Sequence, residues 1–229
     1  LSIHGVYSEQ VDALHSKTIS TAAKITETKV LEWADKLTTD SKIVKKVYKE
    51  KSNVDFEFFY APLDIKKFEN LKNIQKKEKQ VIFIGRNSHE KGIDIIKEIE
   101  TKINAKMVYC TNTKWEDAME ELKASSILIV PSRMESIPQV IKEAFYLKIP
   151  VIATNVGGIP ELIINNKTGI LVPPNNPEIL LKNINELLTD KKTATELSDA
   201  GYDFVMKNLT WEVLLPKYIK FYEELINSK

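Results

Sequence analysis

The chain alternates short apolar runs with longer amphipathic stretches. Residues 81–84 and 127–130 are continuous apolar runs, and the second is β-branched at three of its four positions. Runs of this length, bounded by turn residues, predict central strands of a parallel sheet that are covered on both faces. The stretches between them carry apolar residues three and four positions apart, which predicts helices. Strands that alternate with helices predict parallel βαβ units and a doubly wound, Rossmann-like α/β sheet.

Beyond residue 80 the same alternation continues to the end of the chain. It predicts further strands at 106–110 and 150–154 and helices at 92–103, 115–123, 177–188, 193–206 and 211–226. Before residue 62 it predicts short strands at 1–5, 36–39 and 54–60 and helices at 17–33 and 40–51. So few elements make a poor core by themselves. We therefore expect an incomplete first Rossmann-like domain whose beginning is absent from the sequence.

The segment after the apolar run at 127–130 carries two acids, Glu135 and Glu143, on either side of a predicted helix start. Ser136 and Gln139 between them form a capping-box pattern, which predicts that a helix begins near Ile137. The carboxyl ends of strands face the ligand crevice in an open α/β sheet, so acids placed there can accept hydrogen bonds from hydroxyls. In a chain with 32 acidic residues the spacing alone also fits two solvated glutamates. Its setting between two strands favours a site for a sugar or a ribose.

This region resembles the donor-binding domain of the retaining family-4 glycosyltransferases (glycosyl transferases group 1), which have the GT-B fold. The resemblance covers nearly all of residues 79–228. It rests on Pro-Ser-x-x-Glu-Ser-x-Pro-x-Val-x-x-Glu-Ala from Pro131, Val-Gly-Gly-Ile-Pro-Glu-Leu-Ile from Val156 and Thr-Gly-Ile-Leu-Val-Pro-Pro from Thr168. It implies a metal-independent enzyme of polysaccharide biosynthesis that moves a sugar from a nucleotide-sugar donor, with retention of anomeric configuration. The acceptor would be a glycan, a lipid-linked saccharide or a small molecule.

The resemblance also implies domain boundaries. Residues 1–62 would be the C-terminal part of the acceptor-side domain, 63–79 the interdomain linker and 80–208 the nucleotide-sugar domain. The last segment, 209–229, would be a helix that packs back towards the first domain.

The glycine-basic loop Gly85–Gly92 follows the first apolar strand directly. The resemblance implies that Arg86 and Lys91 hold the donor's diphosphate, and fixed cations lower the barrier because the leaving group gathers negative charge. Arginine offers a planar fork of donors, whereas lysine is a mobile point charge. Standing alone, this loop would also fit a polar surface turn.

The remaining site residues are implied by the same resemblance. Glu143 would bind the ribose and Glu135, a catalytic residue like Arg86 and Lys91, the hydroxyls of the transferred sugar. His4, in Ile3-His4-Gly5, matches a catalytic histidine that faces the donor sugar, although a surface histidine beside a turn fits equally well. The other donor contacts implied are Gly85, Ile137, Gln139, Val140, Gly157 and Gly158. The choice among UDP-, GDP- and ADP-sugars stays open.

Composition narrows the alternatives. The single cysteine, Cys110, indicates a reducing compartment, so we expect a cytoplasmic protein. A net charge of +1 argues against nucleic acid as a partner. No Asp-x-Asp occurs, and with only His4, His15 and His89 we expect no metal site and no cofactor beyond the donor itself.

Three function classes remain open from the sequence. A nucleotide-sugar epimerase of GT-B fold and a non-catalytic nucleotide-sugar binding module are the alternatives to transfer. The cationic loop at 85–92 together with the two acids favours transfer. The lysine face of the helix at 40–51 is compatible with peripheral contact at the inner face of the membrane, but a solvated face is the favoured interpretation.

Overall fold

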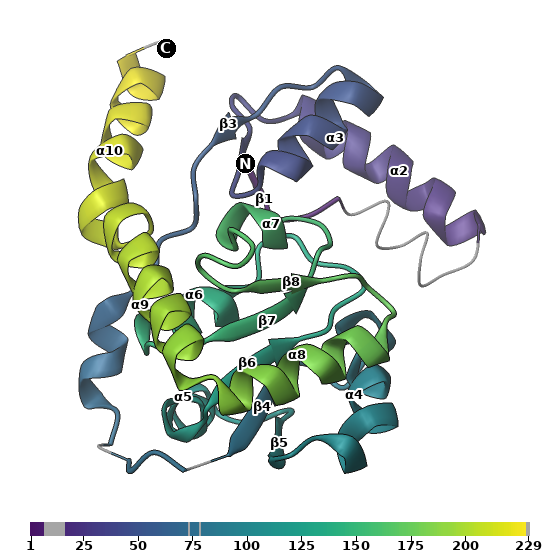
Figure 1. Cartoon of the computed structure of the whole chain (residues 1–229). Coiled ribbons are helices and arrows are strands. Elements are labelled where there is room, and N and C mark those ends of the chain that lie inside the picture. Colours follow the sequence, from purple (N-terminus) through teal and green to yellow (C-terminus); the bar gives the residue numbers. More distant parts are fainter. Residues whose placement is uncertain (7–16, 73, 78, 228–229) are drawn as a thin grey trace. The chain divides into compact units, whose positions relative to one another are not determined.

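The computed structural model describes residues 1–6, 17–72, 74–77 and 79–227, and the chain divides into two compact units (Figure 1). Unit 1 comprises Leu1–Ala61 with Leu214–Lys229, and unit 2 comprises Pro62–Val213. His15 and linker residues 73 and 78 lie outside the described residues.

Unit 2 is built on one parallel sheet in the order β5-β4-β6-β7-β8. Its strands are β4 (Gln80–Ile84), β5 (Lys106–Cys110), β6 (Ile127–Val130), β7 (Val151–Thr154) and β8 (Ile170–Val172). The predicted parallel α/β sheet is confirmed. The chain leaves β4 first towards β5 and then returns to the other side of β4 with β6. That reversal is a topological switch point, where open α/β sheets bind ligands beyond the carboxyl ends of the strands.

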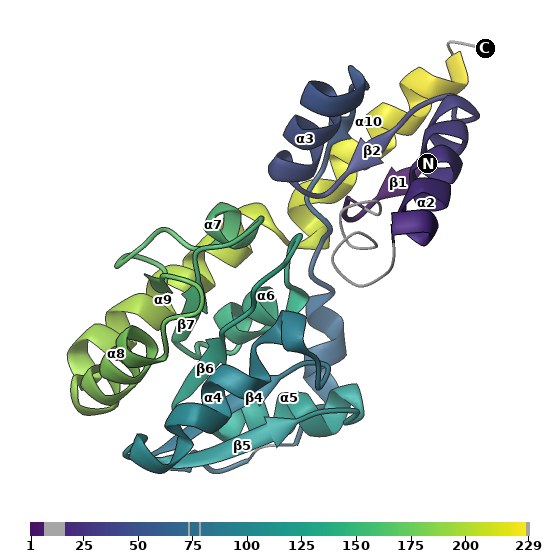
Figure 2. The same cartoon turned by 90° about the vertical axis from the view of Figure 1, so that its right-hand side faces the viewer.

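Helices cover both faces of this sheet (Figures 1 and 2). α4 (Ile93–Ile99) and α8 (Pro177–Thr189) pack against one face, where their apolar stripes meet alternate strand residues such as Val81 and Ile129. α5 (Trp115–Ala124) and α6 (Gln139–Tyr146) pack against β4 and β7 respectively. The remaining helical segments are η1 (Ile65–Asn70), η2 (His89–Lys91), η3 (Glu100–Lys102), α7 (Ile159–Leu162) and α9 (Lys191–Asn208).

The predicted capping box after β6 is wrong. α6 begins at Gln139 with Pro138 at its N-cap, and no side chain caps it. The hydroxyl of Ser136 is buried without a hydrogen-bond partner in the described part of the chain. The reason is Pro138, which disfavours helical backbone at Ile137 and keeps the loop extended for two residues longer.

Unit 1 contains a small parallel sheet of β1 (Ser2–Ile3), β2 (Thr38–Thr39) and β3 (Glu57–Phe58). α2 (Lys17–Glu32) and α3 (Lys42–Ser52) supply a core of Leu31, Val44 and Tyr48 with Phe56. The long helix α10 (Trp211–Asn227) crosses the boundary between the units at Leu214.

Within unit 1, α10 contacts the segment that follows β3. Tyr218 donates a hydrogen bond to the carbonyl of Tyr60 (3.1 Å), and the rings of Tyr218 and Phe221 lie 5.1 Å from that of Phe59. Pro216 is accommodated inside the helix.

Candidate functional site

The loops that follow β4 and β6 meet at the switch point of the sheet. Lys91, at the end of the loop after β4, places its Nζ 2.6 Å from Oε1 of Glu135 in the loop after β6. The Ser132 hydroxyl donates to the same Oε1 at 2.9 Å. The side chains of Lys91 and Glu135 are only 22% and 9% exposed. Both of these contacts use Oε1 of Glu135, which leaves Oε2 to accept a hydrogen bond from a ligand.

Three glycines let neighbouring loops press against this segment. Gly92 (φ +70°) and Gly157 (φ +51°) have left-handed backbone, and a Cβ on them would lie 2.0 Å from the Pro131 carbonyl and 1.8 Å from the Glu135 carbonyl. A Cβ on Gly158 would lie 2.0 Å from the Ser136 carbonyl. These contacts are between backbone segments of the protein itself. The glycines therefore fix where Glu135 sits by allowing the loops after β4, β6 and β7 to touch.

Arg133 fastens the same loop to its neighbours. Its guanidinium makes two hydrogen bonds to the Asp94 carboxylate (2.8 and 2.7 Å) and others to the His89 carbonyl and the Asn175 side chain. The Arg133 hydrogen bond lowers the pKa of Asp94 and the same contact raises the pKa of Arg133, so both stay charged. Sequence reasoning missed this residue, and its only signal was a basic side chain two positions before Glu135.

Arg86 is paired within its own loop. Its side chain is 73% exposed and pairs with Glu90 of the same loop. The preceding residue, Gly85, donates its backbone N–H to the carbonyl of Cys110 at the end of β5. To bind a diphosphate, Arg86 would have to exchange the carboxylate of Glu90 for a phosphate oxygen.

Glu143 lies in the second turn of α6 and is buried. Trp115, the first residue of α5, donates from Nε1 to Oε1 of Glu143 at 2.8 Å. Burial raises the pKa of Glu143, and the hydrogen bond from Trp115 partly opposes that shift. The indole is itself packed edge-on against Phe68, with ring centroids 5.1 Å apart. Trp115 was expected only as the start of a helix, because nothing in the sequence links positions 115 and 143.

The other predicted residues have plainer surroundings. Ile137 and Val140 are half-buried, and Gln139 is exposed at the first position of α6. His4 belongs to unit 1, where its Nδ1 lies 3.1 Å from Asp40 and its Nε2 lies 3.2 Å from the Ser2 hydroxyl. Its role therefore stays a prediction.

Two further observations concern metals and membranes. Among the described residues, no group of three or more His, Cys, Asp or Glu side chains could hold a metal ion. Within the same ranges, no helix is both long enough and apolar enough to cross a membrane. On α3, Lys45 pairs with Asp55, Lys46 with Glu50, and Lys42 lies over the rings of Phe58 and Tyr60.

Comparison with known proteins agrees with this architecture. Residues 95–204, just under half of the chain, match the family model of Glycosyl transferases group 1. The matched range contains Glu135, Glu143, Gly157 and Gly158, whereas Arg86 and Lys91 precede it.

Two uncharacterized glycosyltransferases of Methanocaldococcus jannaschii are similar to the chain. One is 35% identical over 111 residues, or 48% of this chain and 31% of the relative. The other is 24% identical over 254 aligned positions, or 96% of this chain and 65% of the relative. The chain thus spans less than two thirds of the length of either.

Solved structures share the fold. Sucrose-phosphate synthase from Thermosynechococcus elongatus superposes on the whole chain with a TM-score of 0.84 at 20% identity, and the match covers 68% of that protein. Anabaena HepE in complex with UDP-glucose superposes on 97% of the chain with a TM-score of 0.75 at 15% identity, covering 71% of HepE. The chain therefore has the α/β fold with parallel sheets seen in GT-B glycosyltransferases.

Proposed function

We propose that this chain forms the nucleotide-sugar binding part of a retaining glycosyltransferase that acts in the cytoplasm on a saccharide or lipid-linked acceptor. The proposal rests on one observation above all: the Lys91–Glu135 pair at the switch point of the sheet. A cation for phosphate and an acid for hydroxyls stand there within 2.6 Å of each other. A nucleoside diphosphate sugar carries both of those chemistries next to each other. The family match over residues 95–204 and the UDP-glucose complex of Anabaena HepE support the same class of donor.

In the proposed domain arrangement, residues 80–208 bind the donor and residues 1–62 belong to the acceptor side. Residues 63–79 link the two, and 209–229 return towards the first part.

In the proposed reaction the bond between the sugar C1 and the diphosphate oxygen breaks, and the acceptor oxygen forms a new bond to C1 on the same face. The departing diphosphate takes the proton from the acceptor hydroxyl. Lys91 donates to the phosphate oxygens on which negative charge grows, so its attraction is stronger in the transition state than in the ground state. With Arg86 it supplies this stabilisation without a metal ion. Glu135 accepts a hydrogen bond from a sugar hydroxyl through Oε2, and Glu143 accepts from the ribose.

The test is nucleotide binding measured by titration calorimetry with UDP, GDP and ADP. Removal of one charge-assisted contact costs about 1.5–3 kcal/mol, so Lys91→Ala and Arg86→Ala should each weaken the preferred nucleotide roughly ten- to a hundredfold. Glu90→Gln should act in the opposite direction. It releases Arg86 and removes a negative charge beside the phosphates, so binding should tighten up to about fivefold, as an exposed ion pair is worth at most about 1 kcal/mol.

Lys97→Ala is the matched control, because Lys97 is an exposed lysine in the last turn of α4, outside the loop that carries Arg86 and Lys91. Unchanged affinity in the Lys91 and Arg86 variants would overturn the assignment. Incubation of the preferred nucleotide sugar without acceptor separates transfer from epimerisation, since only an epimerase would form the epimer.

A further inference from the structure

Unit 2 has a second hollow at the opposite edge of its sheet, where the strands begin. A cavity of about 440 Å³ opens there beside Ile127 at the start of β6 and Pro150 just before β7, with α8 and α9 forming another wall. This volume falls within the range of small-molecule pockets. The loops that carry Lys91 and Glu135 follow the carboxyl ends of the strands, so the two sites lie at opposite edges of the sheet.

Among the residues that the structure describes, the cavity lining contains five lysines and no acid. The lysines are Lys76, Lys77, Lys79, Lys148 and Lys191. Two of them form salt bridges with acids that do not line the cavity: Lys77 with Glu121 (3.0 Å) and Lys148 with Asp199 (2.7 Å). In the described part of the chain, Lys76, Lys79 and Lys191 have no acidic partner. Three cations around one hollow repel one another, so an anion in the cavity would relieve that repulsion.

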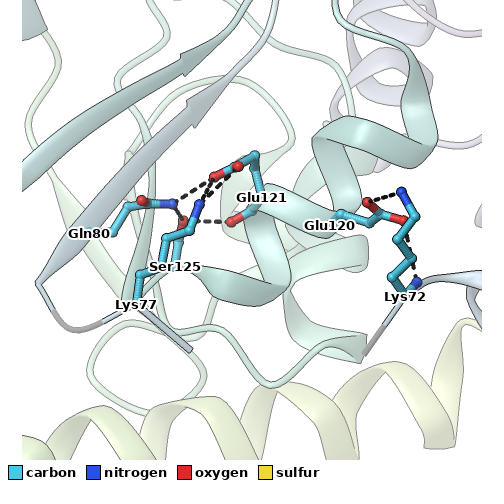
Figure 3. A network of polar contacts seen from close by, with 6 residues as sticks. All are labelled: Lys72, Lys77, Gln80, Glu120, Glu121 and Ser125. Atoms are coloured by element: carbon cyan, nitrogen blue, oxygen red, sulfur yellow. Dashed lines mark hydrogen bonds and ion pairs between the residues drawn. The ribbon is translucent and has the colours of Figure 1, made fainter. Parts of the chain in front are cut away.

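A polar network holds the segment that carries three of these lysines (Figure 3). Glu121 accepts from Lys77 through both oxygens and also from the Gln80 amide at 3.0 Å. Gln80 donates as well to Ser125 at 2.9 Å, and both residues are buried. The hydrogen bond from Lys77 lowers the pKa of Glu121, so this anchor stays charged. Lys77 and Gln80, the residues that follow Lys76 and Lys79, are therefore fastened to α5.

Two of the cavity lysines have an unfavourable backbone conformation. Six described residues other than glycine have positive φ, and four of them are asparagines, which tolerate that region. The other two are Lys79 and Lys148, both with φ 54° and both in the cavity lining. A lysine side chain cannot offset this cost through a local hydrogen bond as an asparagine side chain can. At Lys148 the positive φ belongs to the end of α6, where Lys148 and Ile149 donate their backbone N–H groups to the carbonyls of Phe145 and Ala144. A third, Lys191, is the first residue of α9, where the helix dipole disfavours a cation and favours an anion.

We propose that this cavity binds a phosphate-bearing ligand with at least two negative charges. Lys76, Lys79 and Lys191 would contact the phosphate oxygens, and the apolar wall of Leu187 and Pro150 would accommodate the carbon part of the ligand. Either a free phosphorylated metabolite or a phospholipid headgroup has this chemistry. The site is separate from the proposed donor site and does not depend on it.

The first test compares two neighbouring lysines on α9. Lys191 lines the cavity, whereas Lys192 does not and is paired with Glu196. With pyrophosphate as the probe in calorimetry, Lys191→Gln should weaken binding roughly two- to tenfold, as expected for one partly exposed charge, and Lys192→Gln should leave it unchanged. Equal losses in both variants would show diffuse surface attraction and overturn the proposal.

The second test uses the strained positions. Lys79→Asn and Lys148→Asn place asparagine, which this chain uses at its other positive-φ positions that are not glycine, in the same backbone conformation. Lys79→Asn should lower pyrophosphate affinity while leaving the melting temperature unchanged or raising it by roughly 2–4 °C. Lys148→Asn is the comparison: Lys148 is already paired with Asp199 and is not a proposed phosphate contact, so it should change the affinity less than Lys79→Asn does. Unchanged affinity in the Lys79→Asn variant would mean that this lysine serves the fold alone, and the proposal would fail.

Two further arms identify the source of the ligand and exclude the other site. Sedimentation is done with phosphatidylcholine vesicles, with and without phosphatidylglycerol. If a lipid headgroup is the ligand, the protein should bind the vesicles that contain phosphatidylglycerol, and Lys191→Gln should remove that binding. Stabilisation by sugar phosphates without vesicle binding would indicate a free metabolite. In a protein that already carries Lys91→Ala, Lys191→Gln should still reduce pyrophosphate affinity by the same factor. Absence of both vesicle and phosphate binding in the protein carrying Lys91→Ala would overturn the proposal.

Discussion

Glu143 is a buried acid whose ionisation costs stability. Burial raises its pKa, and the Trp115 hydrogen bond only partly compensates. The folded protein therefore holds the Glu143 proton more tightly than the unfolded chain does. The cost is largest above the raised pKa, and it disappears as the pH falls through the raised pKa towards the value in the unfolded chain.

We expect Glu143→Gln to make the protein more stable at about pH 8, because the amide oxygen can still accept from Trp115 without a charge to bury. The difference between variant and wild type in the free energy of unfolding should shrink as the pH is lowered to about 5. Urea denaturation at the two pH values measures it. Glu161→Gln, at an acid of α7 outside this pair, serves as the control. A pH-independent difference would show that the carboxylate is already compensated.

Asp94, elsewhere in the site, has a pKa shifted in the opposite direction. Asp94 has a lowered pKa because it accepts two hydrogen bonds from Arg133. Its contribution to stability is present at neutral pH and is lost as the pH falls through that lowered value. The site thus combines one acid that resists ionisation with another that is held ionised. This difference comes from burial in one case and from a cation in the other.

At the scale of elements, the glycines after β7 and before α4 determine how closely the site loops approach. Gly157 has positive φ and faces the Glu135 carbonyl at a distance that excludes a methyl group. Gly85 has no positive φ, and a Cβ there would lie 3.2 Å from the ring of Phe83, which would have to shift by only a few tenths of an ångström. Gly157 and Gly85 flank the same site. Alanine substitutions at the two positions therefore test whether the close loop contact, and not glycine as such, is what the fold requires.

We predict that Gly157→Ala destabilises the protein by about 2–4 kcal/mol, from the left-handed backbone and from overpacking against the loop after β6. Gly85→Ala should cost less than about 1 kcal/mol. Urea denaturation of both variants measures the contrast. Similar losses at the two positions would mean that the contact with Glu135 is unimportant for the fold.

Sequence patterns predicted the strands of unit 2 better than its helix termini. The run at 127–130 coincides with β6, because fully buried parallel strands are continuous apolar segments ended by turn residues. The predicted strand at 106–110 coincides with β5, which is the partly buried edge strand of the sheet. The capping box failed because Pro138 imposes its backbone restriction on Ile137 whatever Ser136 could offer. The predicted helix at 92–103 ends earlier as α4 and continues as the short turn η3.

The site was only partly predictable, for a related reason. Lys91 and Glu135 stood out because each follows a recognisable strand, and parallel strands bring such loops to one edge. The contacts of Arg133 with Asp94 and of Trp115 with Glu143 join residues 39 and 28 positions apart. The spacing of apolar and polar residues along one helix or strand does not predict contacts between residues so far apart in the sequence. Such contacts depend on the packing of whole helices.

At the scale of the whole molecule, the two units differ in the cores that hold them. Unit 2 contains a continuous cluster of buried side chains along one face of its sheet, from Val81 in β4 to Leu197 in α9. The described cluster of unit 1 consists of four buried residues around Tyr48, and each of its strands pairs through two residues only. Local stability follows the number of buried apolar contacts and of ladder hydrogen bonds. Unit 1 should therefore open more readily than unit 2.

We predict that hydrogen exchange followed by mass spectrometry will show slow exchange in peptides from β4, β6 and β7. Peptides from β1, β2 and β3 should exchange faster at every denaturant concentration below the main transition, because few backbone bonds there are covered by a core. Addition of the preferred nucleotide should slow exchange in the loops at 85–92 and 131–138, since bound ligand stabilises only the state that holds it. A single exchange rate shared by both units would instead require that they unfold together. In that case α10, which crosses the boundary at Leu214, would couple them.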